Sequence, residues 1–311
     1  TFDDGYPSLF PYSSQWAVST VSPIQGTKSL KHALSNVSGE SYLSIPLSIS
    51  NLAERPMEWT FAMRNGIWAP SSSNAFWFVL TSDSTSIKVG DFNGYAVGVN
   101  LSGTTNLLSL WRITRGKSPE IIIKSDFIWD ENETVGIRVV RTPDGEWTLL
   151  YEPEYGNSTT QIAGQAIDTY HNEVVRCGPA FKYTSTRAGE LWLDDFSVCQ
   201  IDYPPIIHTA TLRNLSTIDI IFSSDINPDN ASLASNYLLK SPEGDEIEVL
   251  EAFPNSDNLT RVSIRTEQLP LSEMLLVVSG ISSANGLTTV NDSITVGVGA
   301  AGTFGLSLIH I

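Results

Sequence analysis

Four aspartates near the two ends of the first two hundred residues are the clearest candidates for metal chemistry. Asp3 and Asp4 follow an aromatic residue at the start of the chain, and Asp194 and Asp195 lie in a late strand candidate. Carboxylate oxygens are the ligands that Ca²⁺ prefers. If the first and last strands of this region pair, the four acids meet at a structural Ca²⁺ site. The alternative is that they are solvated or hydrogen-bonded to backbone amides at strand ends.

A second group of residues has the chemistry of a sugar-binding surface, where flat aromatic rings stack on C–H groups while amides and guanidinium groups bond hydroxyls. The candidates lie on or beside strands that would line one sheet: Asn74, Trp77, Tyr95, Trp111, Arg112 and Tyr183. Trp77 alternates with Phe76 and Phe78, so one side of its strand faces the core, and the sequence leaves open which side. The alternative is that most of the tryptophans fill the core.

No residue spacing matches a catalytic constellation. A retaining glycosidase needs two carboxyl groups about 5 Å apart, and the chain has no Glu-x-Asp-x-x-Glu strand that would supply them. Its four histidines lie outside Gly-x-Ser-x-Gly and reactive-cysteine contexts. Zinc-ligand spacings and glycine-rich phosphate loops are absent from the sequence too. We therefore expect a protein that is not an enzyme.

Cys177 and Cys199 are the two cysteines of the chain. The segment between them has the pattern of two strands around a turn near Ala188. Such a hairpin places the two sulfurs opposite each other, which makes a cross-strand disulfide feasible and favours an oxidising compartment. Two unpaired thiols are an equal alternative, because one bulge would break the register.

Short strands are the elements that must position these residues. Turn residues separate about a dozen strand candidates before residue 204, among them 107–113 and 134–141, and no stretch sustains a helical period. Along 57–64, Met57, Trp59 and Phe61 alternate with polar side chains. The segment 139–151 predicts a hairpin, because Pro143 fixes φ in the turn and Gly145 can take the left-handed conformation. We expect an all-β jelly-roll sandwich over residues 1–203.

The pattern restarts after Pro204-Pro205. All eight tryptophans precede Pro204. Seven further strand candidates follow it: 206–212, 217–223, 237–240, 246–253, 261–266, 275–279 and 293–298. This change predicts an immunoglobulin-like β-sandwich over 204–299 that serves as a spacer. Residues 300–311 fit no element, and 306–311 match the peptide encoded by a sequencing-library adapter, so we expect that peptide to be an artefact.

The charge of the chain limits its partners. With 18 basic and 34 acidic side chains, the formal net charge is -16 at pH 7. Such a surface repels phosphate backbones, so we expect no nucleic-acid partner. No apolar run approaches the length of a membrane helix, so we expect no membrane insertion.

Several short motifs together resemble a family of secreted or surface proteins of the Bacteroidetes type. The motifs of the first region are Phe2-Asp3-Asp4-Gly5, Pro70 to Asn74, Asn93-Gly94-Tyr95, Asp144 to Leu149, Lys182 to Arg187 and Leu193 to Phe196; those of the second are Thr217 to Phe222, Asn236-Tyr237 and Val277 to Ile281. In that family a concanavalin A-like (laminin-G-like) jelly roll precedes an Ig-like domain of the S-layer type, commonly with a lamin-tail-like module downstream.

The resemblance implies an extracellular or cell-surface protein with further domains on the same chain. Concanavalin A-like folds include lectins, glycosidases and adhesion modules, so the fold does not fix a ligand. We expect a non-catalytic binding or adhesion module for a polysaccharide or glycoprotein surface. The alternatives are an accessory part of a secreted polysaccharide-degrading enzyme and a purely structural surface protein.

Overall fold

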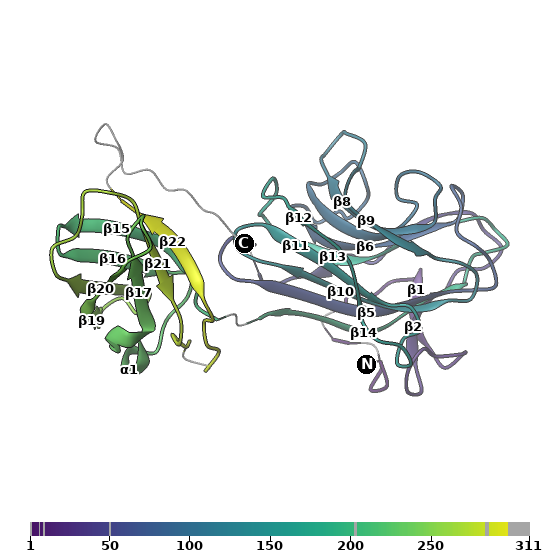
Figure 1. Ribbon diagram of the computed structural model, residues 1–311. Helices are drawn as coiled ribbons and strands as arrows, with labels where there is room; N and C mark the ends of the chain where they lie inside the picture. The colour runs from purple at the N-terminus through teal and green to yellow at the C-terminus, as the bar shows by residue number, and fades with distance from the viewer. Residues whose placement is uncertain are drawn as a thin grey trace. The chain divides into compact units, whose positions relative to one another are not determined.

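Antiparallel strands make up almost all of the regular structure, as the sequence patterns predicted (Figure 1). The computed structural model describes residues 2–5, 7–8, 10–49, 51–201, 204–283 and 286–297. The chain divides into two units, Thr1–Ile201 and Asp202–Ile311, within two residues of the predicted boundary. Over the described ranges, no helix is long and apolar enough to cross a membrane.

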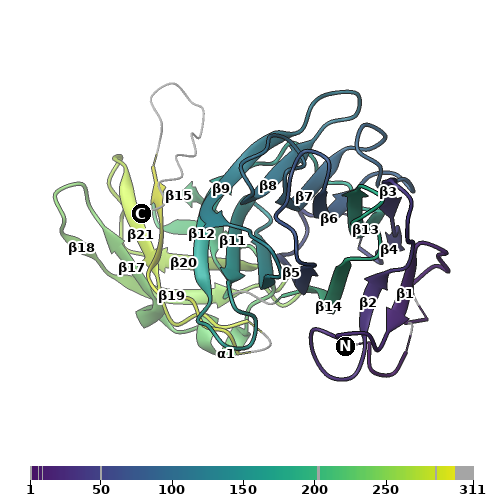
Figure 2. The same ribbon diagram turned by 90° about the vertical axis from the view of Figure 1, so that its right-hand side faces the viewer.

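The first unit is a sandwich of two antiparallel sheets, which form two layers in Figure 2. Sheet A has the order β1 (Trp16–Ser19), β2 (Ser29–His32), β14 (Leu191–Gln200), β5 (Met57–Asn65), β10 (Thr134–Arg141), β11 (Glu146–Glu152), β12 (Gln161–Ile167). Sheet B has the order β3 (Gly39–Tyr42), β13 (Arg176–Tyr183), β6 (Ala75–Ser82), β7 (Gly94–Val99), β8 (Leu107–Ile113), β9 (Glu120–Ile128), and β4 (Ile45–Pro46) also pairs with β13.

The chain crosses repeatedly between the two sheets, for example from β4 to β5, from β5 to β6, and from β12 to β13 and on to β14. As a result β14 lies between β2 and β5 in sheet A, while β13 lies between β3 and β6 in sheet B. This nested order is the topology of a jelly roll. The fold class expected from the sequence is therefore confirmed for the first unit.

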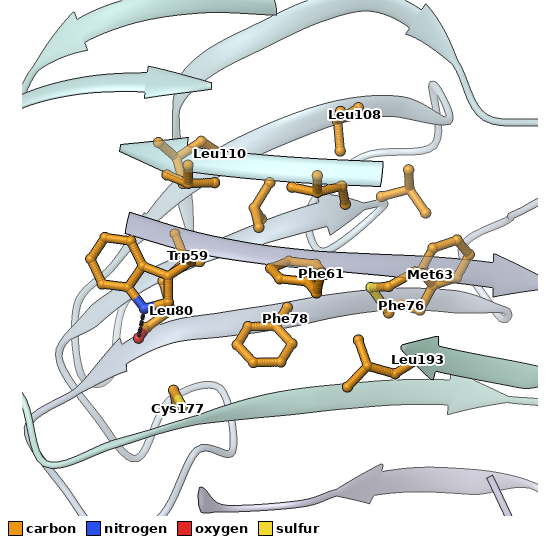
Figure 3. Close-up of a cluster of buried hydrophobic side chains, with 14 of the residues drawn as sticks. Trp59, Phe61, Met63, Phe76, Phe78, Leu80, Leu108, Leu110, Cys177 and Leu193 are labelled. Atoms are coloured by element: carbon orange, nitrogen blue, oxygen red, sulfur yellow. Dashed lines mark hydrogen bonds between the residues drawn. The ribbon is translucent and has the colours of Figure 1, made fainter. Parts of the chain in front are cut away.

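The core of the first unit lies between the sheets. Figure 3 shows Trp59 and Phe61 of β5 near Phe78 of β6, and the rings of Phe61 and Phe78 stack with centroids 4.4 Å apart. The Trp59 indole donates to the carbonyl of Leu80 at 3.1 Å, which satisfies a buried N–H group. The alternation expected along 57–64 is confirmed, because Met57, Trp59 and Phe61 are buried.

The 139–151 hairpin is also confirmed. Strands β10 and β11 pair through the turn 142–145, where Gly145 has a φ of 85° and its N–H donates to the carbonyl of Thr142 at 3.0 Å. A side chain would strain this left-handed position.

The predicted Cys177–Cys199 hairpin is wrong, and with it the disulfide. Cys177 lies on β13 in sheet B and Cys199 lies on β14 in sheet A, so the two strands do not pair. Both thiols are free, with Cys177 buried and Cys199 exposed. Local alternation identified both strands correctly but could not tell that the chain changes sheets between them.

The second unit consists of two four-stranded antiparallel sheets around an aliphatic core. One sheet has the order β15 (Ile207–Asn214), β16 (Thr217–Phe222), β20 (Arg261–Thr266), β19 (Val249–Pro254); the other has the order β18 (Glu246–Ile247), β17 (Tyr237–Lys240), β21 (Met274–Val278), β22 (Asp292–Val296). The predicted strand 246–253 is in fact two strands in different sheets. The sequence also missed the short helix α1 (Pro228–Ala231), the 3-10 turn Ala234–Asn236 and, in the first unit, β12. Predictions for 298–311 lie outside the described residues.

Candidate functional site

The two tryptophans predicted to contact ligand are buried. Trp77 is 3% exposed and Trp111 is 1% exposed. Trp77 lies on the face of sheet B that points away from the main core, because its neighbours Phe76 and Phe78 belong to that core. Both tryptophans are thus buried, as in the alternative that the sequence left open, and ligand contact by them stays a prediction.

The loop between β6 and β7 is the reason for this burial. Ile87 and Phe92 from that loop share a second buried cluster with Trp77, Val79 and Ala96. The Trp111 indole donates to the hydroxyl of Ser102 in the next loop at 2.9 Å. Sheet B thus has apolar cover on both faces, a feature that depends on loop placement and not on strand alternation.

The six candidates also do not line one face. Tyr95 and Tyr183 point into the main core, on the side opposite Trp77. Asn74 accepts hydrogen bonds from the backbone N–H and the hydroxyl of Thr184, so it fixes a turn. Arg112 pairs with Tyr95 across β7 and β8, which places these two on the same side.

Tyr183 belongs to a buried hydrogen-bonded chain with His32 and Ser41. The Ser41 hydroxyl lies 2.9 Å from His32 Nε2 and 2.8 Å from the Tyr183 hydroxyl. Because the Gly189 N–H donates to His32 Nδ1, Nε2 carries the proton of the neutral ring and donates to Ser41. Burial, with a smaller contribution from Lys31, lowers the pKa of His32 to about 4.

This histidine predicts a loss of stability in mild acid. Its ordinary pKa of 6.5 applies to the unfolded chain, which therefore binds a proton first as the pH falls. We expect the free energy of unfolding to fall by about 2 kcal/mol between about pH 7 and pH 5, and by about 3 kcal/mol near pH 4. Urea unfolding followed by tryptophan fluorescence, at a series of pH values in wild type and His32→Gln, measures this dependence. The free energy of unfolding of the variant should fall less between about pH 7 and pH 4 than that of the wild type. An equal fall in both proteins would contradict the prediction.

The four aspartates do not form the predicted calcium site. Asp3 Oδ1 accepts from the N–H of Thr27 at 2.6 Å and from the N–H of Lys28 at 3.0 Å. These bonds, those to Thr27 foremost, lower the pKa of Asp3. The buried Asp194 accepts from Ser29 and from two backbone amides.

Asp195 has a φ of 47° in a bulge of β14, and its carboxylate accepts from the Tyr155 hydroxyl. No group of three or more possible metal-ligating side chains occurs in the described part of the chain. Both oxygens of Asp194 and Oδ1 of Asp3 accept from N–H and O–H donors of the protein, so a cation is not needed to satisfy them. Both aspartates instead hold the segment 25–29 by hydrogen bonds, which is the alternative that the sequence left open.

Arg112 and Tyr95 meet around a third residue, Asp168, that sequence analysis missed. Asp168 is 7% exposed, and its carboxylate accepts from the Tyr95 hydroxyl at 2.6 Å and from Arg112 Nη1 at 2.6 Å. Arg112 Nη2 donates to Glu120 at 2.5 Å. Burial alone would lower the pKa of Arg112, but the carboxylates of Asp168 and Glu120 outweigh it and raise the pKa.

Asp168 begins the loop that follows β12, and hydrogen bonds fix this loop. The Asp168 N–H donates to the carbonyl of Gly145, and the Trp147 indole donates to the Asp168 carbonyl at 3.1 Å. The N–H of Tyr170 donates to the Asp168 carboxylate at 3.0 Å, and that of His171 donates to the Tyr95 hydroxyl. The loop therefore presents its side chains in fixed positions.

Tyr170 is the exposed aromatic residue at this position, with 62% of its surface accessible. The Arg112 guanidinium carbon lies 4.7 Å from the ring centroid, and the His171 ring meets it edge to face at 4.8 Å. The cation thus covers part of the ring, while most of the residue stays open to solvent. We call Tyr95, Arg112, Glu120, Asp168, Tyr170 and His171 the Tyr170 site.

The sequence held only a weak signal for this site. Tyr170-His171-Asn172 is an aromatic and polar triplet between two strands, and loop aromatics of this kind have no periodic pattern. The Tyr170 site can stack a flat apolar face on the exposed ring and bond hydroxyl groups through Glu120, whose side chain is largely exposed.

A separate hollow of about 400 Å³ lies at β1 and β2. It is lined mainly by small side chains, with Lys31 and Glu190 as its charged residues. Lys31 Nζ lies 4.8 Å from the Trp192 ring, and Arg64 lies 4.6 Å from the same ring. None of the six candidates lines this hollow, which has no exposed aromatic face.

No protein-family model matches the chain, and no curated protein matches its sequence. Solved structures show distant likeness. The carbohydrate recognition domain of Emp47p matches with a TM-score of 0.45 and 10% identity, over 60% of this chain and 89% of that one. The VIP36 exoplasmic/lumenal domain, in its Ca²⁺/Man3GlcNAc-bound form, matches with a TM-score of 0.45 and 11% identity, over 65% of this chain and 89% of that one.

The N-terminal part of the bacterial S-layer protein SbsC matches with a TM-score of 0.28 and 10% identity, over 30% of this chain and 23% of that one. This chain thus spans about a quarter of the SbsC structure. At TM-scores under 0.5, these likenesses carry nothing about function. The resemblance to secreted Bacteroidetes-type proteins, including the Ig-like and lamin-tail features, stays a prediction.

Proposed function

We propose that the first unit is a non-catalytic module that binds polysaccharide or glycoprotein glycans at the Tyr170 site. The observation that carries the proposal is the open ring of Tyr170, fixed by its own backbone bond to Asp168 and by the Arg112 guanidinium against it. A pyranose presents a face of C–H groups to such a ring, while its hydroxyls bond the polar groups at the rim.

Rigidity supports the proposal. Asp168 accepts from Tyr95, Arg112 and the Tyr170 backbone, so little ordering entropy remains to be lost when a ligand binds. Both Asp168 oxygens are engaged by protein donors, which favours a structural role for this carboxylate over a role as nucleophile or acid. We propose further that the module acts outside the cell, where glycan surfaces lie, and that the second unit serves as its spacer.

Replacing Tyr170 by alanine tests the site. The probes are a panel of soluble glucans, mannans and xylans. We expect the affinity of the full chain for the polysaccharide that it binds to fall by about tenfold or more, because the stacking surface is lost. The measurement is isothermal titration calorimetry, with tryptophan fluorescence confirming the fold.

Tyr12→Ala is the matched control, since Tyr12 is 93% exposed and lies outside the site. It should change the affinity by less than about twofold. If no glycan of the panel binds the wild type, or if Tyr170→Ala binds as the wild type does, the proposed function is wrong.

A further inference from the structure

The positive charge at the Tyr170 site is already neutralised by the protein. Arg112 Nη1 donates to Asp168 and Nη2 donates to Glu120. Its Nε is enclosed and has no hydrogen-bond partner among the residues that the structure describes. An acidic ligand would therefore meet a guanidinium whose two terminal nitrogens each face a carboxylate of the protein.

The other cation near this site, Arg141, is fully buried: it interacts with Asp168 from the core side and donates to the Leu52 carbonyl and to Asn172. Burial, ahead of several smaller electrostatic effects, lowers the pKa of His171, so its ring is neutral near pH 7. At the accessible rim Glu120 and Arg112 carry opposite charges, and Arg141 offsets the charge of Asp168 beneath them, so no uncompensated positive charge of the described residues faces a ligand, on a chain whose formal net charge is -16. Like charges at close range disfavour an anionic partner.

Glu120 is the accessible member of this group. Its side chain is 56% exposed, whereas that of Asp168 is 5% exposed and that of Arg112 is 22% exposed. A ligand on the Tyr170 ring thus reaches Glu120 and Arg112 at the rim, while Asp168 stays beneath them. Without the Glu120 carboxylate, Arg112 Nη2 would be free to donate to a ligand carboxylate in the geometry that guanidinium groups favour.

We propose that Glu120 determines the charge selectivity of the site, so that it binds neutral sugars and excludes uronic acids. This inference rests on the proposed function and names its ligand class. Glu120 excludes acidic sugars in two ways: it repels their carboxylates, and it occupies the Arg112 nitrogen that would otherwise bind them.

Glu120→Gln in the full chain is the test, with three neutral hexasaccharides (of glucose, mannose and xylose) and hexagalacturonate as probes. We expect the wild type to bind at least one neutral probe about tenfold more tightly than hexagalacturonate. The variant should bind hexagalacturonate about tenfold more tightly than the wild type does, and the gain should shrink as ionic strength rises. Because Glu120 also lies within reach of ligand hydroxyls, the affinity of the variant for neutral probes should fall by about threefold to tenfold, so that both effects shift selectivity toward hexagalacturonate.

Glu154→Gln is the matched control, because it makes the same change in net charge on the exposed turn after β11. It should leave all affinities unchanged. The inference is overturned if the wild type binds neutral and acidic probes equally, or if Glu120→Gln gains no affinity for hexagalacturonate. The proposed function is decided separately, by the Tyr170→Ala result. If the wild type binds none of the probes and nothing in the polysaccharide panel, both are overturned together.

Discussion

Replacing Asp168 by alanine should lower the free energy of unfolding of the first unit by about 3 kcal/mol and abolish glycan binding. The reason is that three donors lose their acceptor at once: the Tyr95 hydroxyl, Arg112 Nη1 and the Tyr170 N–H. The Tyr95 hydroxyl is buried in the core, where an unsatisfied polar group is costly. Arg112 still donates to Glu120 in the variant, which limits the loss of stability.

Urea unfolding followed by tryptophan fluorescence measures this effect in the full chain, because all eight tryptophans lie in the first unit. Asp168→Asn is the matched variant, since it keeps the shape and one acceptor oxygen; it should cost about half as much. A loss below about 0.5 kcal/mol in Asp168→Ala would show that this carboxylate does not organise the site.

Replacing Gly98 by alanine should destabilise the first unit by about 4 kcal/mol. Gly98 lies on the central strand β7 with a φ of 155°, and a Cβ there would lie 2.4 Å from the Phe76 carbonyl oxygen and 2.5 Å from the Trp77 Cα. Both atoms belong to the backbone of β6, so relief requires the two strands to separate. The same urea experiment measures the loss.

Gly39→Ala is the control for Gly98, because it adds the same methyl group to a strand of the same sheet. Its nearest neighbour would be the Tyr183 hydroxyl at 3.6 Å, an ordinary contact. We expect a change within about 0.5 kcal/mol. If both variants lose a similar amount of free energy of unfolding, the close approach of β6 and β7 does not explain the need for glycine at position 98.

Most of the strands were predictable from the sequence, because alternation and turn chemistry are local. The strands at 107–113, 134–141, 237–240 and 261–266 have the bounds that the sequence predicted. Sheet membership was not predictable in the same way. The segment 177–199 contains two real strands, yet β13 and β14 belong to different sheets, and only the long-range pairing decides this.

The candidate site was predictable only in part. Arg112 and Tyr95 belong to it, but Tyr95 contributes a hydroxyl from the core and not a stacking face. Trp77 was misjudged because its cover comes from Ile87 and Phe92, residues of a loop whose path strand patterns do not give. Tyr170 was missed because its exposure also depends on the path of a loop. Hydrogen bonds hold that loop so that the ring faces solvent.

The position of β14 constrains the order in which the first unit can fold. This strand completes sheet A by pairing with β2 and β5, so that Trp192 lies beside Lys31. Until β14 has been synthesised, β5 keeps an open edge next to Trp59 and Phe61. Long-range pairings of this kind slow folding, and open apolar edges promote association between chains. The last strand of the unit is therefore also the one that protects its nascent chain from aggregation.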